Sequence, residues 1–134
     1  MGIRFPVVQT ARHAEPFFGS AGLSVKRVEH ALDRLFAELP DQSWGANLIH
    51  SPNEPALEEE VTELYLQKGV RIISAAAFLG VTANLVRYAA TGLSKDQHGN
   101  ILRKNYVFAK ISHPQIAAQF LRPAPSDMLQ KLVA

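Results

Sequence analysis

The chain has 134 residues, which is enough for one domain built around one hydrophobic core. Its composition, 47% hydrophobic and 19% charged, excludes disordered and fibrous classes, and the absence of cysteine excludes disulfides and thiolate zinc sites. A net charge of +2 without a basic block argues against nucleic-acid binding, and charges interrupt every apolar run, so no membrane span is expected. Residues 1–9 hold too short an apolar run for a signal peptide, and we expect a cytoplasmic protein.

Two short apolar runs near the start of the chain predict strands. The first covers residues 4–9 and ends at Gln9, and the second covers residues 17–23. Gly19 and Gly22 interrupt the second run. They fit either a tight turn from a strand into a helix or a backbone segment that a ligand can approach closely.

The strongest helical pattern follows at residues 24–39. Ser24 is a suitable N-cap, and Pro40 ends the pattern. Apolar residues repeat between them at the spacing of one helix face, namely Val25, Val28, Ala31, Leu32, Leu35, Phe36 and Leu39.

Residues 44–49 predict a strand buried on both faces, and a polar loop follows it. Asn47 is the polar residue inside this run. It should have a hydrogen-bond partner, because burying an amide without one costs about 1–3 kcal/mol. His50 comes where the strand ends, and ligands of parallel α/β sheets bind at the carboxyl ends of strands, so this loop is a candidate site. The alternative is an Asn bonded to a neighbouring strand and followed by a solvated turn.

Residues 55–68 predict a second helix with three glutamates near its start. Pro55 suits the first turn, and Glu58, Glu59 and Glu60 favour the positive end of the helix dipole. Consecutive helical residues point in different directions. We therefore interpret the acidic run as a solvated helix start, and no metal site is predicted.

The rest of the chain continues the alternation of strands and helices. Strands are predicted at residues 70–76, where Ser74 begins a run of small residues, and at residues 106–111. Lys110 is unexpected inside the last strand, because a lysine there either extends to solvent or meets an anion. Three more helices are predicted: one at residues 82–91, one that begins at Pro114, and one that follows an N-cap at Ser126. Residues 96–100 predict a turn flanked by two short arms.

About five strands that alternate with helices over short connections predict an α/β fold with a parallel sheet. The sequence contains no glycine-rich dinucleotide motif, phosphate loop, nucleophile elbow or histidine-rich zinc pattern. The residue patterns alone therefore indicate an α/β half-domain and no specific chemistry.

Several segments, in the same order, resemble the PfaD-like enoyl reductases. They are residues 17–23 (FFGSAGL), 45–55 (GANLIHSPNEP), 69–78 (GVRIISAAAF), 85–88 (LVRY) and 107–112 (VFAKIS). These flavoproteins use FMN, act in trans with polyketide and polyunsaturated-fatty-acid synthases, and are related to the nitronate monooxygenases. The resemblance implies a partial (β/α)8 TIM barrel. It also implies hydride transfer from NAD(P)H through FMN to an enoyl thioester on an acyl carrier protein of the synthase.

The resemblance covers nearly the whole chain, but the family members are several times longer. A complete barrel takes about 250 residues. The helix that the family places between Gln9 and Phe17 is missing, as are the later strands and their phosphate-binding loops. We therefore expect residues 1–134 to form a single domain, equivalent to the amino-terminal portion of such a barrel. A non-catalytic half-barrel that serves as a scaffold or interaction protein is the alternative.

Two expectations follow from the incomplete barrel. The isolated chain should hold FMN weakly or not at all, because the phosphate of such cofactors is bound by late loops and a helix amino end. The open edges of the barrel should also favour self-association.

By resemblance, the residues near the flavin are those at the strand ends. They are Gln9, Gly19, Ser20, Asn47, Ser74 and Lys110. Asn47 would contact the polar edge of the isoalloxazine ring, and Lys110 would stabilise the reduced anionic flavin. His50 either supplies a proton to the substrate or caps its loop, and the resemblance assigns no catalytic residue.

Overall fold

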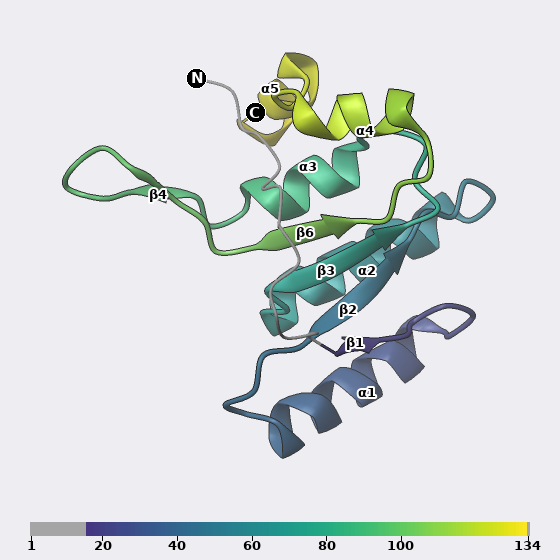
Figure 1. Cartoon of the computed structure of the whole chain (residues 1–134). Coiled ribbons are helices and arrows are strands. Elements are labelled where there is room, and N and C mark those ends of the chain that lie inside the picture. Colours follow the sequence, from purple (N-terminus) through teal and green to yellow (C-terminus); the bar gives the residue numbers. More distant parts are fainter. Residues whose placement is uncertain (1–15, 134) are drawn as a thin grey trace.

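The computed structural model describes residues 16–133. The predicted strand at residues 4–9, together with Gln9, lies outside the described residues. The described chain alternates between strands and helices through its third helix, and then continues with a hairpin, one more strand and two helices (Figure 1).

Four parallel strands form the main sheet. They are β1 (Phe17–Phe18), β2 (Gly45–Ile49), β3 (Ile72–Ala76) and β6 (Tyr106–Ala109), and they lie in the order β1-β2-β3-β6. Each strand pairs with the next one along the sheet, as in the wall of a barrel. The predicted α/β class and parallel sheet are confirmed for the described residues.

Helices connect these strands and cover the sheet. They are α1 (Val25–Glu38), α2 (Pro55–Lys68), α3 (Ala83–Ala90), α4 (Pro114–Leu121) and α5 (Ser126–Val133). In Figure 1, α2 lies behind the sheet, while α1 and α3 contact α2 on either side of it. The sequence predicted α2 with its observed bounds, and it placed α1 and α3 within a residue of theirs.

The capping residues explain where these helices begin and end. Ser24 Oγ accepts from the backbone N–H of Arg27, and Thr82 Oγ1 accepts from that of Leu85, which confirms Ser24 and Thr82 as N-caps. Gly69 ends α2 in the left-handed conformation, with φ at 77°. Ser126 is the first residue of α5 rather than its cap, because the first helical hydrogen bond runs from the N–H of Leu129 to the carbonyl of Pro125, which is the capping position.

The alternation of side chains along the strands separates two faces of the sheet. On one face, the strand residues pack into the hydrophobic core with the helices. The strand residues of this core are Ala46, Leu48, Ile73, Ala75 and Val107, and its buried helix residues include Val28, Leu32, Val61, Leu64, Tyr65, Leu85 and Val86. The described helices therefore cover this face, as expected for the outer face of a barrel wall.

The other face carries the residues that alternate with the core. The register pairs Asn47 with Ser74 and Ser74 with Phe108, so their three side chains share this face. The ring of Phe17 meets the ring of Phe108 edge to face at 5.6 Å. It also lies over Gly45, where an added Cβ would be 2.5 Å from the ring, so only glycine fits there.

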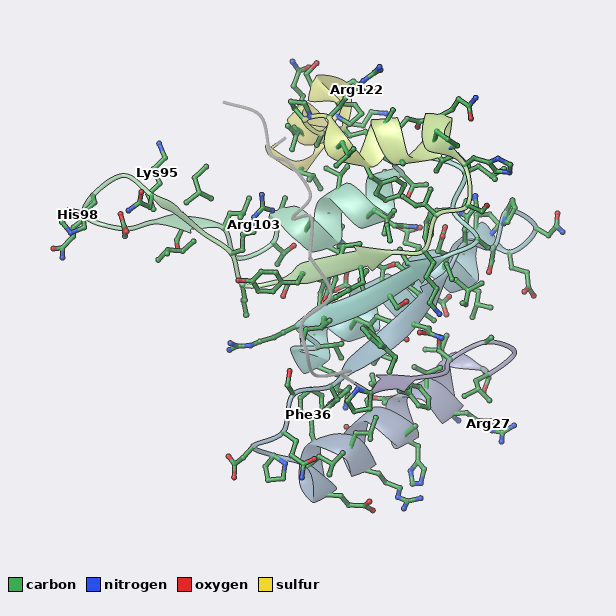
Figure 2. The ribbon with its side chains drawn as sticks, in the orientation of Figure 1. Arg27, Phe36, Lys95, His98, Arg103 and Arg122 are labelled. Atoms are coloured by element: carbon green, nitrogen blue, oxygen red, sulfur yellow. The ribbon has the colours of Figure 1, made fainter. Side chains whose placement is uncertain are left out.

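A hairpin interrupts the barrel-like pattern between α3 and β6. Its strands are β4 (Ser94–Lys95) and β5 (Ile101–Leu102), which pair antiparallel, and the predicted turn with two short arms is confirmed. We call residues 94–102 the arm, because Figure 1 shows this segment extending away from the sheet. Lys95 and His98 extend from the arm, and Arg103 lies near its base (Figure 2).

Within residues 16–133, no helix is both long enough and apolar enough to span a bilayer.

Candidate functional site

The candidate site lies at the carboxyl edge of the parallel strands, where the loops after β1 and β2 lie next to each other. The backbone oxygen of Asn47, in β2, binds the loop after β1 and α2 to this strand. It accepts hydrogen bonds from Ser20 Oγ and from Tyr65 Oη, each at 2.7 Å. Burial raises the pKa of Tyr65 to about 12, so its hydroxyl stays a neutral donor. Ser20 is itself buried, whereas the neighbouring Gly19 is exposed.

Within residues 16–133, the Oδ1 atom of Asn47 is not bonded to a neighbouring strand, which was the alternative that the sequence left open. Its Oδ1 is buried, and it has no hydrogen-bond partner among the described residues. Its partner across the register, Ser74, is buried with 1% of its surface exposed. This alternative is therefore wrong for Oδ1, because the adjacent strand supplies a small side chain that does not reach it.

Asn47 and Ser74 also lie deeper in the sheet than predicted. Each is the third residue of its strand, and pairing between β2 and β3 continues to Ile49 and Ala76. The backbone N–H of His50 then donates to the oxygen of Ala76 at 3.0 Å. His50 is therefore the first residue after β2, whereas Asn47 lies inside the strand.

The prediction that Lys110 lies inside a buried strand is wrong. β6 ends at Ala109, and the Lys110 side chain is exposed. The backbone N–H of Lys110 still donates to the oxygen of Ala75 at 2.9 Å, which keeps the residue at the same edge of the sheet. Its ammonium extends to solvent, the first of the two expected outcomes.

Glu58 is the functional candidate that sequence reasoning missed. It lies in the first turn of α2 with 6% of its surface exposed, whereas Glu59 and Glu60 are exposed as predicted. Its Oε1 is 3.0 Å from His50 Nδ1, and its Oε2 accepts from Asn84 Nδ2 at 3.3 Å. The interpretation of the whole run as solvated is therefore wrong for Glu58, because the first turn of α2 faces the end of β2.

His50 is held from several sides. Besides its contact with Glu58, its ring stacks on Phe78 with 4.9 Å between the ring centres and 27° between their planes. Its side chain is 24% exposed. The loop after β2, the first turns of α2 and α3, and the segment after β3 thus each contribute one residue to this cluster. We call His50, Glu58, Asn84 and Phe78 the His50 cluster.

A cavity of about 440 Å³ adjoins this cluster. It lies between the loop that leads into α1 and the loop that leads into α2, and Ser20, Ser51 and Glu58 are among its lining residues. No group of three or more metal-binding side chains occurs among residues 16–133. The described site therefore combines a buried carboxylate, a half-buried imidazole and hydroxyl groups, which suits proton transfer and hydrogen bonding.

A signal for Glu58 was present in the sequence, although it was ambiguous. A polar residue at the end of one strand and a carboxylate in the first turn of the next helix come together in many α/β units, because strand end and helix start share one edge. Three adjacent glutamates were candidates, and the rotation of α2 about its axis decides that Glu58 is the one that faces His50.

Comparisons show that the chain is similar to parts of proteins named for polyketide and polyunsaturated-fatty-acid synthesis. It is 46% identical over 118 residues to the polyketide biosynthesis protein PksE of Bacillus subtilis, a match that covers 87% of this chain and 15% of that protein. It is 41% identical over 117 residues to part of the polyunsaturated fatty acid synthase of a Thraustochytrium species, covering 87% of this chain and 8% of that protein. No protein-family model matches the chain.

A solved structure agrees with these relatives. The enoyl reductase domain of MlnA, from the macrolactin biosynthesis cluster of Bacillus amyloliquefaciens, superimposes with a TM-score of 0.83 at 36% identity. The match covers 87% of this chain and 27% of that one. The resemblance to the PfaD-like enoyl reductases is therefore confirmed, and this chain corresponds to a minor part of each of these proteins.

Proposed function

We propose that the chain is the amino-terminal portion of an FMN-dependent enoyl reductase that reduces enoyl thioesters in polyketide or polyunsaturated-fatty-acid synthesis. The observation that carries the proposal is the superposition of 87% of the chain on the enoyl reductase domain of MlnA, at 36% identity. Residues 1–134 would then be a single unit of the barrel wall. The substrate would be an enoyl thioester on an acyl carrier protein, and NAD(P)H would be the reductant.

Asn47 and Ser74, which share one face of the sheet, fit a flavin on one independent observation. Asn47 Oδ1 is buried and lacks a donor among the described residues, and an unsatisfied buried acceptor costs about 1–3 kcal/mol. The polar edge of an isoalloxazine ring offers an N–H donor. Asn47 would accept from that edge, with Ser74 opposite it across the register.

FMN, when bound, would supply the hydride that reduces the carbon–carbon double bond of the substrate. The chain would bind and orient it. Ser20 fixes the backbone of Asn47 through its hydrogen bond. Gly19 leaves open space beside the end of β1, where no atom lies within 4 Å of an added Cβ. The exposed ammonium of Lys110, at the same edge, would lie near the negative charge of the reduced ring.

The mass of the intact natural polypeptide tests this proposal. A mass several times the 14.7 kDa of this chain would supply the later strands and phosphate-binding loops that complete a barrel. Purified as 134 residues, the protein should be colourless after dialysis against buffer without flavin. A stoichiometric flavin spectrum from this chain alone would contradict the expectation that phosphate binding needs the later loops.

One observation favours the alternative, a non-catalytic half-barrel that associates with other chains. Among the described residues, β1 pairs only with β2, and β6 pairs only with β3, so each outer strand has a free edge. Free edges promote association. Sedimentation of the 134-residue chain should then show a dimer or a larger species. A monomer at a protein concentration of roughly tens of micromolar, where weak interfaces still form, would contradict self-association.

A further inference from the structure

The His50 cluster contains a buried carboxylate that the flavin site does not use. Glu58 is 6% exposed, and its two oxygens face two different partners, His50 Nδ1 and Asn84 Nδ2. An ionised carboxylate only accepts hydrogen bonds, so Nδ1 must carry the hydrogen in its contact with Glu58. Among residues 16–133, no hydrogen bond reaches Nε2 of the same ring. The cluster therefore fixes one ring nitrogen and leaves the other available.

Three contacts keep the ring in this orientation. The backbone of His50 is bonded to Ala76 at the end of β3, its face stacks on Phe78, and Glu58 holds Nδ1. Asn84 in turn holds Glu58 from the first turn of α3. A loop cap would need only a single hydrogen bond to the backbone, whereas this arrangement orders an imidazole through residues from three elements.

We propose that Glu58, supported by Asn84, is a positioning residue that holds His50 so that its Nε2 delivers a proton to the substrate. The inference rests on the proposed function. In the proposed reaction, a hydride that bound reduced flavin would supply adds to the β carbon of the enoyl thioester. The electron pair of the double bond then forms the new bond between the α carbon and a proton.

His50 supplies that proton from its imidazolium form. The bond between Nε2 and its hydrogen breaks, its electron pair stays on the ring, and the neutral ring keeps its hydrogen on Nδ1. The carboxylate of Glu58 stabilises the imidazolium before transfer and selects the tautomer after it. Solvent returns a proton to the ring, since the side chain is 24% exposed.

The first test measures the tautomer of His50 by long-range hydrogen–nitrogen NMR correlation in the 134-residue chain without cofactor. The wild-type neutral ring should carry its hydrogen on Nδ1. In Glu58→Gln, the side-chain oxygen of the new glutamine still accepts from Asn84 Nδ2, so its amide N–H2 group faces His50. The Nδ1 atom of His50 must then accept a hydrogen bond, and the neutral imidazole carries its hydrogen on its own Nε2. Glu59→Gln, one residue along and exposed, should keep the wild-type tautomer. An unchanged tautomer in a folded Glu58→Gln protein would overturn the positioning role.

The second test uses the intact flavin-loaded protein and follows its two half-reactions separately by flavin absorbance. His50→Gln should slow the oxidation of reduced flavin by an enoyl thioester on the order of 10²- to 10⁴-fold, the usual contribution of a general acid. Glu58→Gln should slow the same step by about tenfold or more, since it leaves the ring in the wrong tautomer. Reoxidation of His50→Gln at the wild-type rate would overturn the proton transfer.

The two tests separate this inference from the proposed function. If wild-type flavin is not reoxidised by any enoyl thioester, the proposed function fails, and the proton transfer fails with it. If wild-type reoxidation is normal and the variants behave like wild type, the inference alone is overturned. A shifted tautomer in Glu58→Gln together with a selective loss of the thioester step supports both.

Discussion

The sheet and the arm are stabilised in different ways. Each strand of the sheet buries side chains against helices that are distant in sequence, and residues such as Ile73 and Leu85 are fully buried. The arm buries nothing comparable, since Ser94, Lys95, Ile101 and Leu102 are all exposed. Its order comes from Asp96, which accepts from the backbone N–H groups of His98 and Asn100 and from the side chain of Asn100.

This difference shows which part of the chain resists substitution. A side chain in the sheet and its helices is held by packing from several elements, so removing its atoms leaves a cavity. A side chain in the arm meets solvent, so removing it changes little. Substitutions in the two regions, taken from the largest expected effect to the smallest, test this contrast.

Leu85→Ala should have the largest effect. Leu85 is fully buried in α3, and truncation of such a leucine costs about 2–5 kcal/mol through lost burial and the cavity left behind. Leu102→Ala is the matched change in the arm, where half of the side chain is exposed, and it should alter stability by about 0.5 kcal/mol or less. Urea unfolding of both variants measures the difference, and equal losses would remove the contrast between the two regions.

Asn105→Ala should have the next largest effect, because this residue joins the two regions. Asn105 is 3% exposed, and its Nδ2 donates to the backbone oxygens of Tyr88 and Thr91 at the end of α3. These oxygens lie beyond the internal hydrogen bonds of the helix. Leaving the buried oxygen of Tyr88 without this donor should cost about 1–3 kcal/mol in the free energy of unfolding, which urea unfolding measures.

Lys104→Ala is the control for this junction, because Lys104 is exposed next to Asn105. Its loss should change the unfolding free energy by about 0.5 kcal/mol or less. A similar loss in both variants would show that the contacts of Asn105 with α3 do not hold the base of the arm.

Asn47→Leu should have a smaller effect, although Asn47 lies in the sheet. Its Oδ1 has no partner among the described residues, so replacing the amide by an apolar group of similar volume should change the unfolding free energy by about 1 kcal/mol or less, in either direction. In the intact protein, the same change should give a folded protein with less flavin or slower hydride transfer. Normal flavin content and normal turnover would exclude a flavin contact for Asn47.

The smallest effect is expected in the arm at acid pH. The side chain and backbone of Asn100, and then the backbone of His98, lower the pKa of Asp96 below its ordinary value of 3.8. A lowered pKa means that ionised Asp96 stabilises the turn above the unfolded pKa, and that this stabilisation is lost as the pH falls through the folded pKa.

The backbone N–H groups of His98 and Asn100 report this change. Their NMR signals should move together below about pH 3.8, the ordinary pKa of an aspartate, while signals from α2 and β2 stay in place. Simultaneous changes throughout the protein would show instead that the turn is coupled to global unfolding. Asp96→Ala should remove the local transition.

Much of the local structure was predictable from short stretches of the sequence. Ser24, Thr82 and Gly69 specified helix ends because each acts on backbone groups within a few residues of itself. The parallel sheet followed from alternating strand and helix patterns, and the turn of the arm followed from Asp96 and its neighbours. Each of these features depends on short stretches of chain, so their patterns were readable without a structure.

The burial and the partners of the site residues, in contrast, depend on how the elements pack together. Glu58 is buried and Glu59 is exposed because the first turn of α2 presents one of them to His50 and Asn84, which lie on other elements. Lys110 is exposed because β6 ends at Ala109, where its pairing with β3 ends. Burial and hydrogen-bond partners depend on how distant segments pack together, and the spacing of residues along the chain does not specify that packing.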